Sequence, residues 1–316
     1  MNPPVAVCFE KISHSYGRRQ ALADLSLSIL AGEIFVFLGP NGGGKTTLFR
    51  VLSTLIPPQT GAAQILGLDL RREQTEIRRR IGVVFQAPSL DRKLTVVENI
   101  QQQAALYGLF GSELRRRRDE LLDQFALRDR ASERVERLSG GLRRRVELAK
   151  GMIHRPGLLL LDEPSTGLDP GARADLWDYL RRARQVSGVT VVLTTHLLEE
   201  ADKADRIAIL NEGKLVALDT PEALRSSVGG ELIVIESQAA EELAAGLRNR
   251  LSLPAQVVEG TVRLETPGGH QWIAKIVEEF PGRVGAIRLG KPTLEDVFIA
   301  RTGHRFRRER EDVSHA

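Results

Sequence analysis

A glycine-rich loop between a buried strand and a helix is the feature that most constrains the fold of this chain. Residues 39–46 have the sequence GPNGGGKT, which matches the pattern G-x-x-x-x-G-K-[ST]. The apolar run at 33–38 is typical of a buried strand, and residues 46–55 have a helical pattern that ends at Pro57 and Pro58. Glycines allow successive backbone N–H groups to point at phosphates, where the helix N-terminus adds positive charge. The sequence therefore predicts a phosphate-binding loop in an α/β fold.

The loop supplies candidate ligands for a nucleotide and its metal ion. Lys45 is placed to reach the terminal phosphates, and the Thr46 hydroxyl to ligate Mg²⁺. A glycine-rich turn that contains a lysine by chance is the alternative, which the flanking strand and helix disfavour. A GTPase lacks support because the sequence contains no N-K-x-D guanine motif. The predicted phosphate-binding residues are Gly39, Pro40, Asn41, Gly42, Gly43, Gly44, Lys45, Thr46 and Thr47.

Two acids follow a second apolar run. The leucines at 158–161 predict a buried strand that delivers Asp162 and Glu163 at its carboxyl end, where open α/β sheets bind ligands. Asp162 suits Mg²⁺, directly or from the second shell, and Glu163 suits polarising an attacking water. Acids after a strand are also common as helix caps, but their pairing with the upstream loop favours a catalytic role.

The order of strands and helices predicts the domain organisation. Strands are expected at 5–12, 21–29, 33–38, 81–85, 158–161, 190–194 and 206–210, with a helix at 172–186 and helical character from 95 to about 155. Such alternation predicts a largely parallel sheet interrupted by a helical insertion, here about residues 87–157. The first domain is therefore expected to span residues 1–228.

A small α+β domain is expected at 229–303. Strands at 231–237 and 283–289, helices at 239–251 and 269–280, and a hairpin at 256–265 that turns at Glu259 and Gly260 give the order βαββαβ. That order is the ferredoxin-like split unit, and a last helix follows at 293–301. The charged tail, residues 304–316, lacks apolar periodicity and is predicted to be disordered.

Composition and charge constrain the compartment and the partners. The sequence has 316 residues, a formal net charge of +4 and one cysteine, Cys8, so it cannot form an internal disulfide and suits a reducing cytoplasm. No apolar run is long enough to cross a bilayer, and no secretory signal is recognisable. Arginine clusters at 78–80, 115–118, 143–145 and 305–310 could bind nucleic acid or an anionic membrane, but acids accompany each cluster. We interpret them as solvated helix faces and expect no nucleic acid partner.

Taken in order, these motifs resemble the ABC ATPase family over roughly residues 5–220. Leu138, Ser139, Gly140 and Gly141 are similar to the family's signature, and residues 165–169 to its D-loop. His196 resembles the switch histidine and Gln86 the Q-loop glutamine, while Tyr16 falls where the family stacks an aromatic ring on adenine. Each of these features is weak alone, but their shared order makes the resemblance specific.

The resemblance implies two ATP molecules between two head-to-tail cassettes. Ser139, Gly140 and Gly141 of one copy would contact the γ-phosphate held by Lys45 of the other. Glu163 would orient the water, His196 would sense the γ-phosphate, and Asp169 would pass information across the interface. The implied cofactors are ATP and Mg²⁺, with Thr46, Gln86 and Asp162 as the candidate metal ligands.

One position departs from the family's pattern. The fifth signature residue is usually glutamine, whereas this chain has Leu142. Because the serine and glycines that would contact phosphate are present, we expect ATP binding to survive. The contacts that an amide would make with the nucleotide or its neighbours are in doubt.

The end of the small domain, KPTLEDVFIARTG at 291–303, resembles the daunorubicin-resistance type of ABC-2 exporter ATPases. The resemblance implies a dimeric, ATP-hydrolysing export subunit held peripherally at the cytoplasmic face of the cell membrane by a separate permease. The groove near Gln86 and residues 87–94 would receive the permease's cytoplasmic helices. A soluble ABC ATPase of translation or DNA repair is the alternative, and a module that holds ATP without turnover is a third. For the small domain, dimer support or packing is favoured over ligand sensing, and the transported substrate leaves no trace.

Overall fold

The computed structural model describes residues 4–306. The chain divides into two compact units, Met1–Leu215 and Val216–Ala316. This division falls before the boundary expected after residue 228. The reason is that helix α8 (Pro221–Ser226) packs against α11 (Leu294–Thr302), which belongs to the second unit.

The first unit is built around a sheet of order β10-β9-β3-β8-β7-β6, and the division between the units falls within its edge strand β10. The pairs β3–β8, β3–β9, β7–β8 and β6–β7 are parallel, as predicted. The central strands β3, β7 and β8 are buried throughout, which explains the apolar runs at residues 34–38, 158–161 and 191–193 within them. The sheet consists of β3 (Ile34–Leu38), β6 (Ile81–Val84), β7 (Leu158–Asp162), β8 (Thr190–Thr195), β9 (Arg206–Asn211) and β10 (Lys214–Asp219).

The parallel register brings the ends of the central strands together. Leu38 lies opposite Thr195, and Asp162 lies opposite Thr194. The loop after β3, the acids after β7 and the residues after β8 therefore emerge at one edge of the sheet, where open α/β sheets bind ligands.

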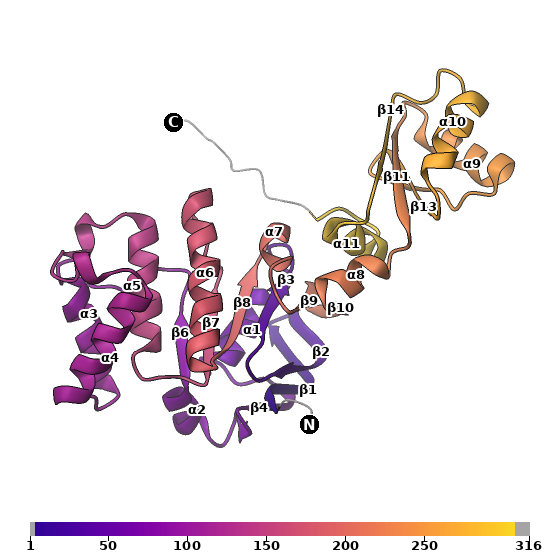
Figure 1. Cartoon of the computed structure of the whole chain (residues 1–316). Helices are drawn as coiled ribbons and strands as arrows, with labels where there is room; N and C mark the ends of the chain where they lie inside the picture. Colours follow the sequence, from indigo (N-terminus) through magenta and orange to yellow (C-terminus); the bar gives the residue numbers. More distant parts are fainter. Residues whose placement is uncertain (1–3, 307–316) are drawn as a thin grey trace, which may run out of the picture. The chain divides into compact units, whose positions relative to one another are not determined.

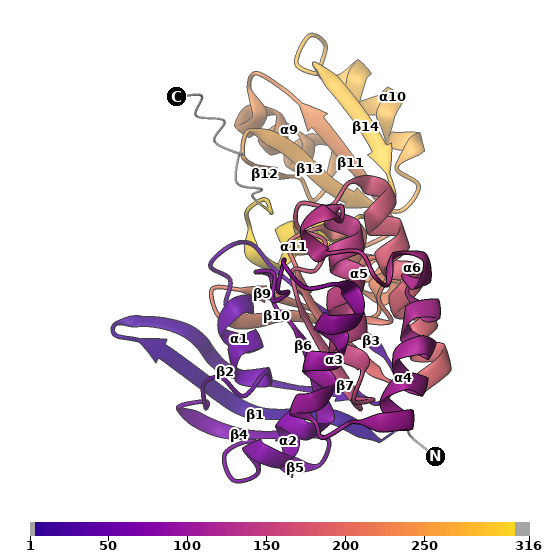
Figure 2. The same ribbon diagram turned by 90° about the vertical axis from the view of Figure 1, so that its left-hand side faces the viewer.

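A second, four-stranded sheet has the order β2-β1-β4-β5. Strands β1 (Val5–Tyr16) and β2 (Arg19–Leu30) form a long antiparallel hairpin, and Figure 2 shows β4 (Thr60–Ile65) beside β1. The short strand β5 (Leu68–Asp69) and helix α2 (Gln74–Arg80) follow. Neither β4, β5 nor α2 was predicted, because Gly61, Ala62 and Ala63 carry little strand signal.

The predicted helical insertion lies between β6 and β7. It contains α3 (Val96–Leu106), α4 (Gly111–Gln124), the short 3₁₀ helices Arg128–Arg130 and Val135–Arg137, and α5 (Gly140–Met152). These helices lie together at one side of the central sheet (Figure 1). The core of the unit is completed by α1 (Lys45–Leu52), α6 (Pro170–Ser187) and α7 (Leu198–Ala201).

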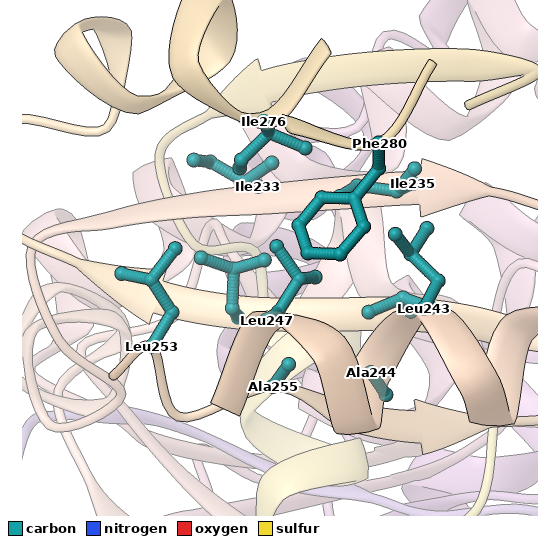
Figure 3. Packing of buried hydrophobic residues seen from close by; sticks show 11 residues of the cluster. Ile233, Ile235, Leu243, Ala244, Leu247, Leu253, Ala255, Ile276 and Phe280 are labelled. Atoms are coloured by element: carbon teal, nitrogen blue, oxygen red, sulfur yellow. The ribbon is translucent and has the colours of Figure 1, made fainter. Parts of the chain in front are cut away.

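The second unit has the predicted order βαββαβ: β11 (Glu231–Glu236), α9 (Ala240–Leu251), β12 (Gln256–Val258), β13 (Thr261–Thr266), α10 (His270–Glu279) and β14 (Ala286–Gly290). Its antiparallel sheet has the order β12-β13-β11-β14, as expected of a ferredoxin-like unit. The hairpin turns at Glu259 and Gly260, which both have positive φ. Side chains of α9 and α10 pack on one face of this sheet, with Phe280 between them (Figure 3).

The start of the predicted disordered tail is packed. Phe306 is buried, its ring centroid 4.9 Å from that of Phe298, and Arg305 donates to the Thr261 hydroxyl at 2.9 Å. Residues 307–316 lie outside the described residues. Within residues 4–306, no helix has the length and apolar content needed to cross a bilayer.

The arginine clusters differ in their surroundings. Arg79 and Arg116 form exposed ion pairs with acids on their own helices, as predicted. The interpretation as a solvated face is wrong for Arg144, which is 7% exposed. Its burial follows from a partner acid, Glu147, one helical turn further along α5.

Candidate functional site

The phosphate-binding loop at 39–44 joins β3 to α1, as predicted. Its glycines are required where the backbone passes close to other backbone. At Gly44, whose φ is 104°, a Cβ atom would lie 2.7 Å from the carbonyl oxygen of Ala21; at Gly39 it would lie 2.6 Å from that of Leu210. A backbone oxygen cannot move aside as the end of a flexible side chain can. The packing of the loop therefore excludes larger residues at these two positions.

Lys45, the first residue of α1, is held inside the loop. Its side chain is 4% exposed, and Nζ donates to the carbonyl oxygens of Gly39 at 2.8 Å and Pro40 at 3.2 Å. Nζ also lies 3.4 Å from Glu163 Oε1. Burial lowers the pKa of Lys45, although Glu163 opposes this effect. The ammonium group is thus held by neutral oxygens and one carboxylate, which phosphate oxygens could replace.

The two acids after β7 share one threonine. The Thr194 hydroxyl donates to Asp162 Oδ1 at 2.6 Å and accepts the backbone N–H of Glu163 at 3.0 Å. Burial raises the pKa of Asp162, and the bond from Thr194 opposes that rise. Sequence reasoning missed Thr194 as a site residue, although its place at the end of a predicted parallel strand was a usable signal.

Glu163 lies between two basic side chains. Its backbone has a φ of 41°, an unusual conformation for a residue with a side chain. Oε2 is 3.1 Å from His196 Nδ1, and the Thr166 hydroxyl donates to it at 3.4 Å. Burial raises the pKa of Glu163, but His196 and Lys45 outweigh burial and hold the pKa below its usual value. The carboxylate is therefore charged and can accept a hydrogen bond from water.

A pocket of about 310 Å³ opens over the loop. Of the predicted residues, the pocket is lined by Tyr16, Asn41, Gly42, Gly44, Lys45, Thr46, Thr47 and Glu163. Tyr16 is half-exposed, and its ring meets that of His14 edge-on at 4.9 Å. An aromatic ring at one end and N–H groups with a lysine at the other suit a base and its phosphates.

Three lining residues were missed by sequence reasoning: Arg19, Ala21 and Arg50. Arg19 Nη2 donates to the carbonyl oxygen of Gly42 at 3.5 Å, so it connects the hairpin of Tyr16 with the phosphate loop. The sequence indicated a role for Arg19 in the pocket only by its position, three residues after Tyr16.

Other predicted residues lie outside this pocket. Gln86 follows β6 and is exposed. The hydroxyl of Ser139 caps α5 by accepting the N–H of Leu142 at 3.3 Å, and Gly140 and Gly141 begin that helix. Asp169 caps α6 by accepting the N–H of Ala172 at 2.8 Å. The signature residues and the D-loop residue thus hold helix ends in this chain and do not line the pocket of their own Lys45.

The strand, loop and helix around Lys45, with the acids after β7, define a P-loop NTPase cassette. The family model described as "ABC transporter" matches residues 22–166. The chain is 40% identical over 314 residues to a daunorubicin resistance ATP-binding protein of Streptomyces coeruleorubidus, with 95% of this chain and 96% of the relative covered. It is 36% identical to a Nod factor export ATP-binding protein of Rhizobium johnstonii, with 95% and 96% covered.

Solved structures give the same result. The cbiO1 subunit from Clostridium perfringens has a TM-score of 0.67 at 25% identity, covering 79% of this chain and 96% of that one. The dimeric cassette MJ0796 with ADP and Pi has a TM-score of 0.61 at 30% identity, covering 68% and 98%. The chain belongs to the family of ABC transporter ATP-binding proteins, whose members bind and hydrolyse ATP.

Proposed function

We propose that this chain is the ATP-hydrolysing subunit of an ABC-2-type exporter. It binds MgATP between two head-to-tail cassettes and drives a separate membrane permease. The observation that carries the hydrolytic role is the charged carboxylate of Glu163, held between Lys45 and His196 beside the pocket. The export role is supported by relatives named for daunorubicin resistance and Nod factor export, each matched over almost the whole chain.

In this proposal the residues of one cassette divide the work of hydrolysis. Tyr16 stacks on the adenine, and Lys45 with the loop N–H groups binds the phosphates. Glu163 accepts a hydrogen bond from the attacking water, and His196 contacts the γ-phosphate. Phosphoryl transfer depends mainly on positioning and charge neutralisation, which this set of groups provides.

The residues present also fit a magnesium ion. In proteins Mg²⁺ is held by one or two carboxylates, hydroxyls, waters and substrate phosphates. The Thr46 hydroxyl lines the pocket, and Asp162 lies at the end of β7, so these two residues are the proposed ligands together with Gln86. The ion would neutralise charge on the β- and γ-phosphates. Within residues 4–306 no cluster of three or more histidine, cysteine or acidic residues forms a separate metal site.

The proposed dimer follows from the position of the signature. Ser139 and Gly140 are exposed and Gly141 is half-buried at the N-terminus of a 13-residue helix, a favourable site for an anion. None of the three lines the pocket of its own chain. A second copy in head-to-tail orientation would use them to close the γ-phosphate side of the site. Asp169 would then lie at the interface between the copies.

The proposed permease contact is a groove between the central sheet and the helical insertion. It has a volume of about 350 Å³, and its lining includes Leu55, Phe85, Ser89, Gln103 and Tyr107. Leu55 in this lining is a large, exposed apolar side chain. A helix from the permease would cover it and place the chain at the cytoplasmic face of the cell membrane.

The experiment is affinity purification of the full chain from its native membrane. A polytopic membrane protein should co-purify, and substitution Leu55→Asp, in the groove lining, should reduce its recovery. Val186→Asp is the matched control, because Val186 is also exposed and apolar but lies on α6 outside the groove lining. Recovery of ribosomes or DNA without a membrane protein would contradict the proposal and support a soluble, non-transport ABC ATPase.

A further inference from the structure

One face of helix α5 carries a buried ion pair that the proposed hydrolysis does not use. Arg144 and Glu147 are 7% and 5% exposed, and Nη1 of Arg144 lies 2.8 Å from Oε2 of Glu147. Removing two charges from water is costly unless their remaining donors and acceptors are satisfied. The other contacts of this pair therefore indicate what it holds.

The pair contacts the chain on both sides of Gln86. Arg144 Nη1 donates to the carbonyl oxygen of Phe85 at 3.0 Å, and Oε1 of Glu147 accepts the N–H of Ser89 at 2.9 Å. Lys150, two turns along the same helix, donates from Nζ to the carbonyl oxygen of Ser89 at 2.6 Å. Side chains of α5 thus bind backbone groups immediately before Gln86 and just after it.

Residues 89–94 are held by the helical insertion as well. Asn99 of α3 accepts the N–H of Asp91 at 2.9 Å and donates to the carbonyl oxygen of Asp91 at 3.0 Å. The N–H of Val135 donates to Leu94 at 3.0 Å. Before the loop, the strand β6 pairs with β7 of the central sheet. The exposed residues 86–88 therefore connect a segment fixed to the sheet with one fixed to the insertion.

We propose that Arg144, Glu147 and Lys150 are positioning residues that clamp the Gln86 loop to helix α5. The same helix begins with Gly140 and is capped by Ser139. The clamp therefore connects the Gln86 loop to the same helix that presents the signature residues at its N-terminus. This inference rests on the proposed function, in which Gln86 approaches the metal and the signature closes the partner's site.

The substitution that tests the clamp removes both charges. Breaking a buried pair by losing one partner leaves an unpaired charge, whereas replacing both by apolar residues of similar volume is often neutral for folding. The test variant is therefore Arg144→Met with Glu147→Leu in the full chain. Its matched control is Arg79→Met with Glu76→Leu, which removes an exposed ion pair of the same three-residue spacing from α2.

The first measurement is hydrogen exchange of the backbone amides. In the wild type, the Ser89 amide, which donates to Glu147, should be protected. In the test variant it should exchange faster, while the Asp91 amide, which donates to Asn99, and the amides of β3 and β8 stay protected. The control variant should match the wild type. Free exchange of the Ser89 amide in the wild type, or unchanged protection of it in the test variant, would overturn the clamp.

The second measurement is steady-state ATP hydrolysis with ATP affinity. A misplaced Gln86 should lower kcat by roughly 10- to 100-fold, because small displacements of positioning groups have effects of that size. The dissociation constant for ATP should stay within about twofold of the wild type. In a Gln86→Ala background the clamp substitutions should cause little further loss, because both act on the same group. Losses that multiply instead would mean that the pair acts elsewhere and would overturn the inference.

The two measurements separate this inference from the proposed function. A wild-type chain without ATPase activity would refute the proposed function, while the exchange of the Ser89 amide would still decide whether the clamp exists. Normal hydrolysis by the test variant, with faster exchange at Ser89, would refute the positioning role and leave the proposed function intact.

Discussion

The two units of the chain differ in how many polar side chains they bury. In the first unit, Lys45, Arg144, Glu147, Asp162 and Thr194 are all buried, each bonded to polar partners. In the second unit, the core is a cluster of aliphatic side chains and Phe280 (Figure 3), and buried Asp296 pairs with Arg263. Burying a polar group is costly without a partner, so a fold retains such groups where they have a task.

The buried polar side chains indicate which part of the chain carries the functional site. The polar groups of the first unit converge at the edge of the sheet where β3, β7 and β8 end, and the pocket lies there. The second unit has its salt bridges mainly at exposed positions, such as Arg288 with Glu236 and Arg250 with Glu279. We expect substitutions of the polar side chains at this edge of the sheet to change the chemistry, and substitutions in the core of the second unit to change its stability.

The largest effect is expected from Glu163→Gln. Losing the charged acceptor should lower kcat for ATP by roughly 10²- to 10⁴-fold, the range for positioned acid–base groups. ATP should still bind, and the dimer should persist on size-exclusion chromatography because the γ-phosphate remains. The exposed Glu199→Gln on α7 should keep wild-type kcat. Unchanged steady-state hydrolysis by Glu163→Gln would remove Glu163 from its assigned role.

Phe280→Ala should instead change the stability of the second unit and leave ATP binding unaffected. The ring packs on Gly246 of α9 and among the core residues, so its loss should lower the free energy of unfolding of the second unit by roughly 3–5 kcal/mol. Val277→Ala, at an exposed position of α10, should cost far less. The affinity for ATP should not change in either variant.

The two tryptophans allow each unit to be followed alone. Trp177 lies in α6 of the first unit, and Trp272 lies in α10 of the second. In a Trp177→Phe background, Trp272 fluorescence follows the second unit, and Phe280→Ala should lower the urea concentration at its unfolding midpoint. An equal decrease in the midpoint followed by Trp177, in a Trp272→Phe background, would show that the two units unfold together. That result would contradict the contrast between the units.

A smaller effect on stability is expected from the protonation of His154, and it should be confined to the first unit. Burial lowers the pKa of His154 to about 4; its Nε2 lies 2.9 Å from the carbonyl oxygen of Ile81, and its ring stacks on Tyr107. In the unfolded chain the pKa is near 6.5, so the unfolded state binds the proton first as the pH falls. Neutral His154 therefore makes its full contribution to the free energy of unfolding above pH 6.5, and this contribution is lost progressively towards pH 4.

The measurement is urea unfolding at pH 7 and pH 5, followed by Trp177. His154 should account for a loss of about 2 kcal/mol in the free energy of unfolding at pH 5. His154→Gln should remove that part of the pH dependence, whereas His270→Gln, at an exposed position, should keep it. The same pH dependence in His154→Gln would mean that another group titrates.

The sequence predicted the fold well where apolar runs or turn residues carried the signal. Strands β3 and β7 are fully buried and contain continuous apolar runs, and Glu259–Gly260 indicated the hairpin of the second unit. Strand β4 was missed because its pairing with β1 is long-range and its residues are small.

The candidate site was predicted to the extent that motifs describe it. Lys45 and Glu163 follow from local patterns, and the structure brings them to 3.4 Å. The place of Thr194 at the end of a predicted strand was a usable signal, but its contact with Asp162 depends on strand register. The role of Arg19 depends on hairpin geometry, which no local pattern encodes. Arg144 was hidden in an arginine cluster, because only the tertiary fold shows which member of such a run is buried.

The most direct test of the central claim is to mix two inactive variants. In a head-to-tail dimer, each site combines Lys45 of one copy with Gly140 of the other. The first variant is Lys45→Ala. The second is Gly140→Asp, which has open space for the side chain because the nearest atom to a new Cβ, Leu168 Cδ2, is 4.0 Å away. The added carboxylate suits a helix N-terminus but would repel the γ-phosphate.

Each variant alone should hydrolyse almost no ATP. Their heterodimer has one doubly defective site and one intact site, so an equimolar mixture should recover roughly a quarter of the wild-type rate if dimers form at random. A mixture as inactive as its components, with exchange of subunits verified, would contradict the head-to-tail dimer on which this account depends.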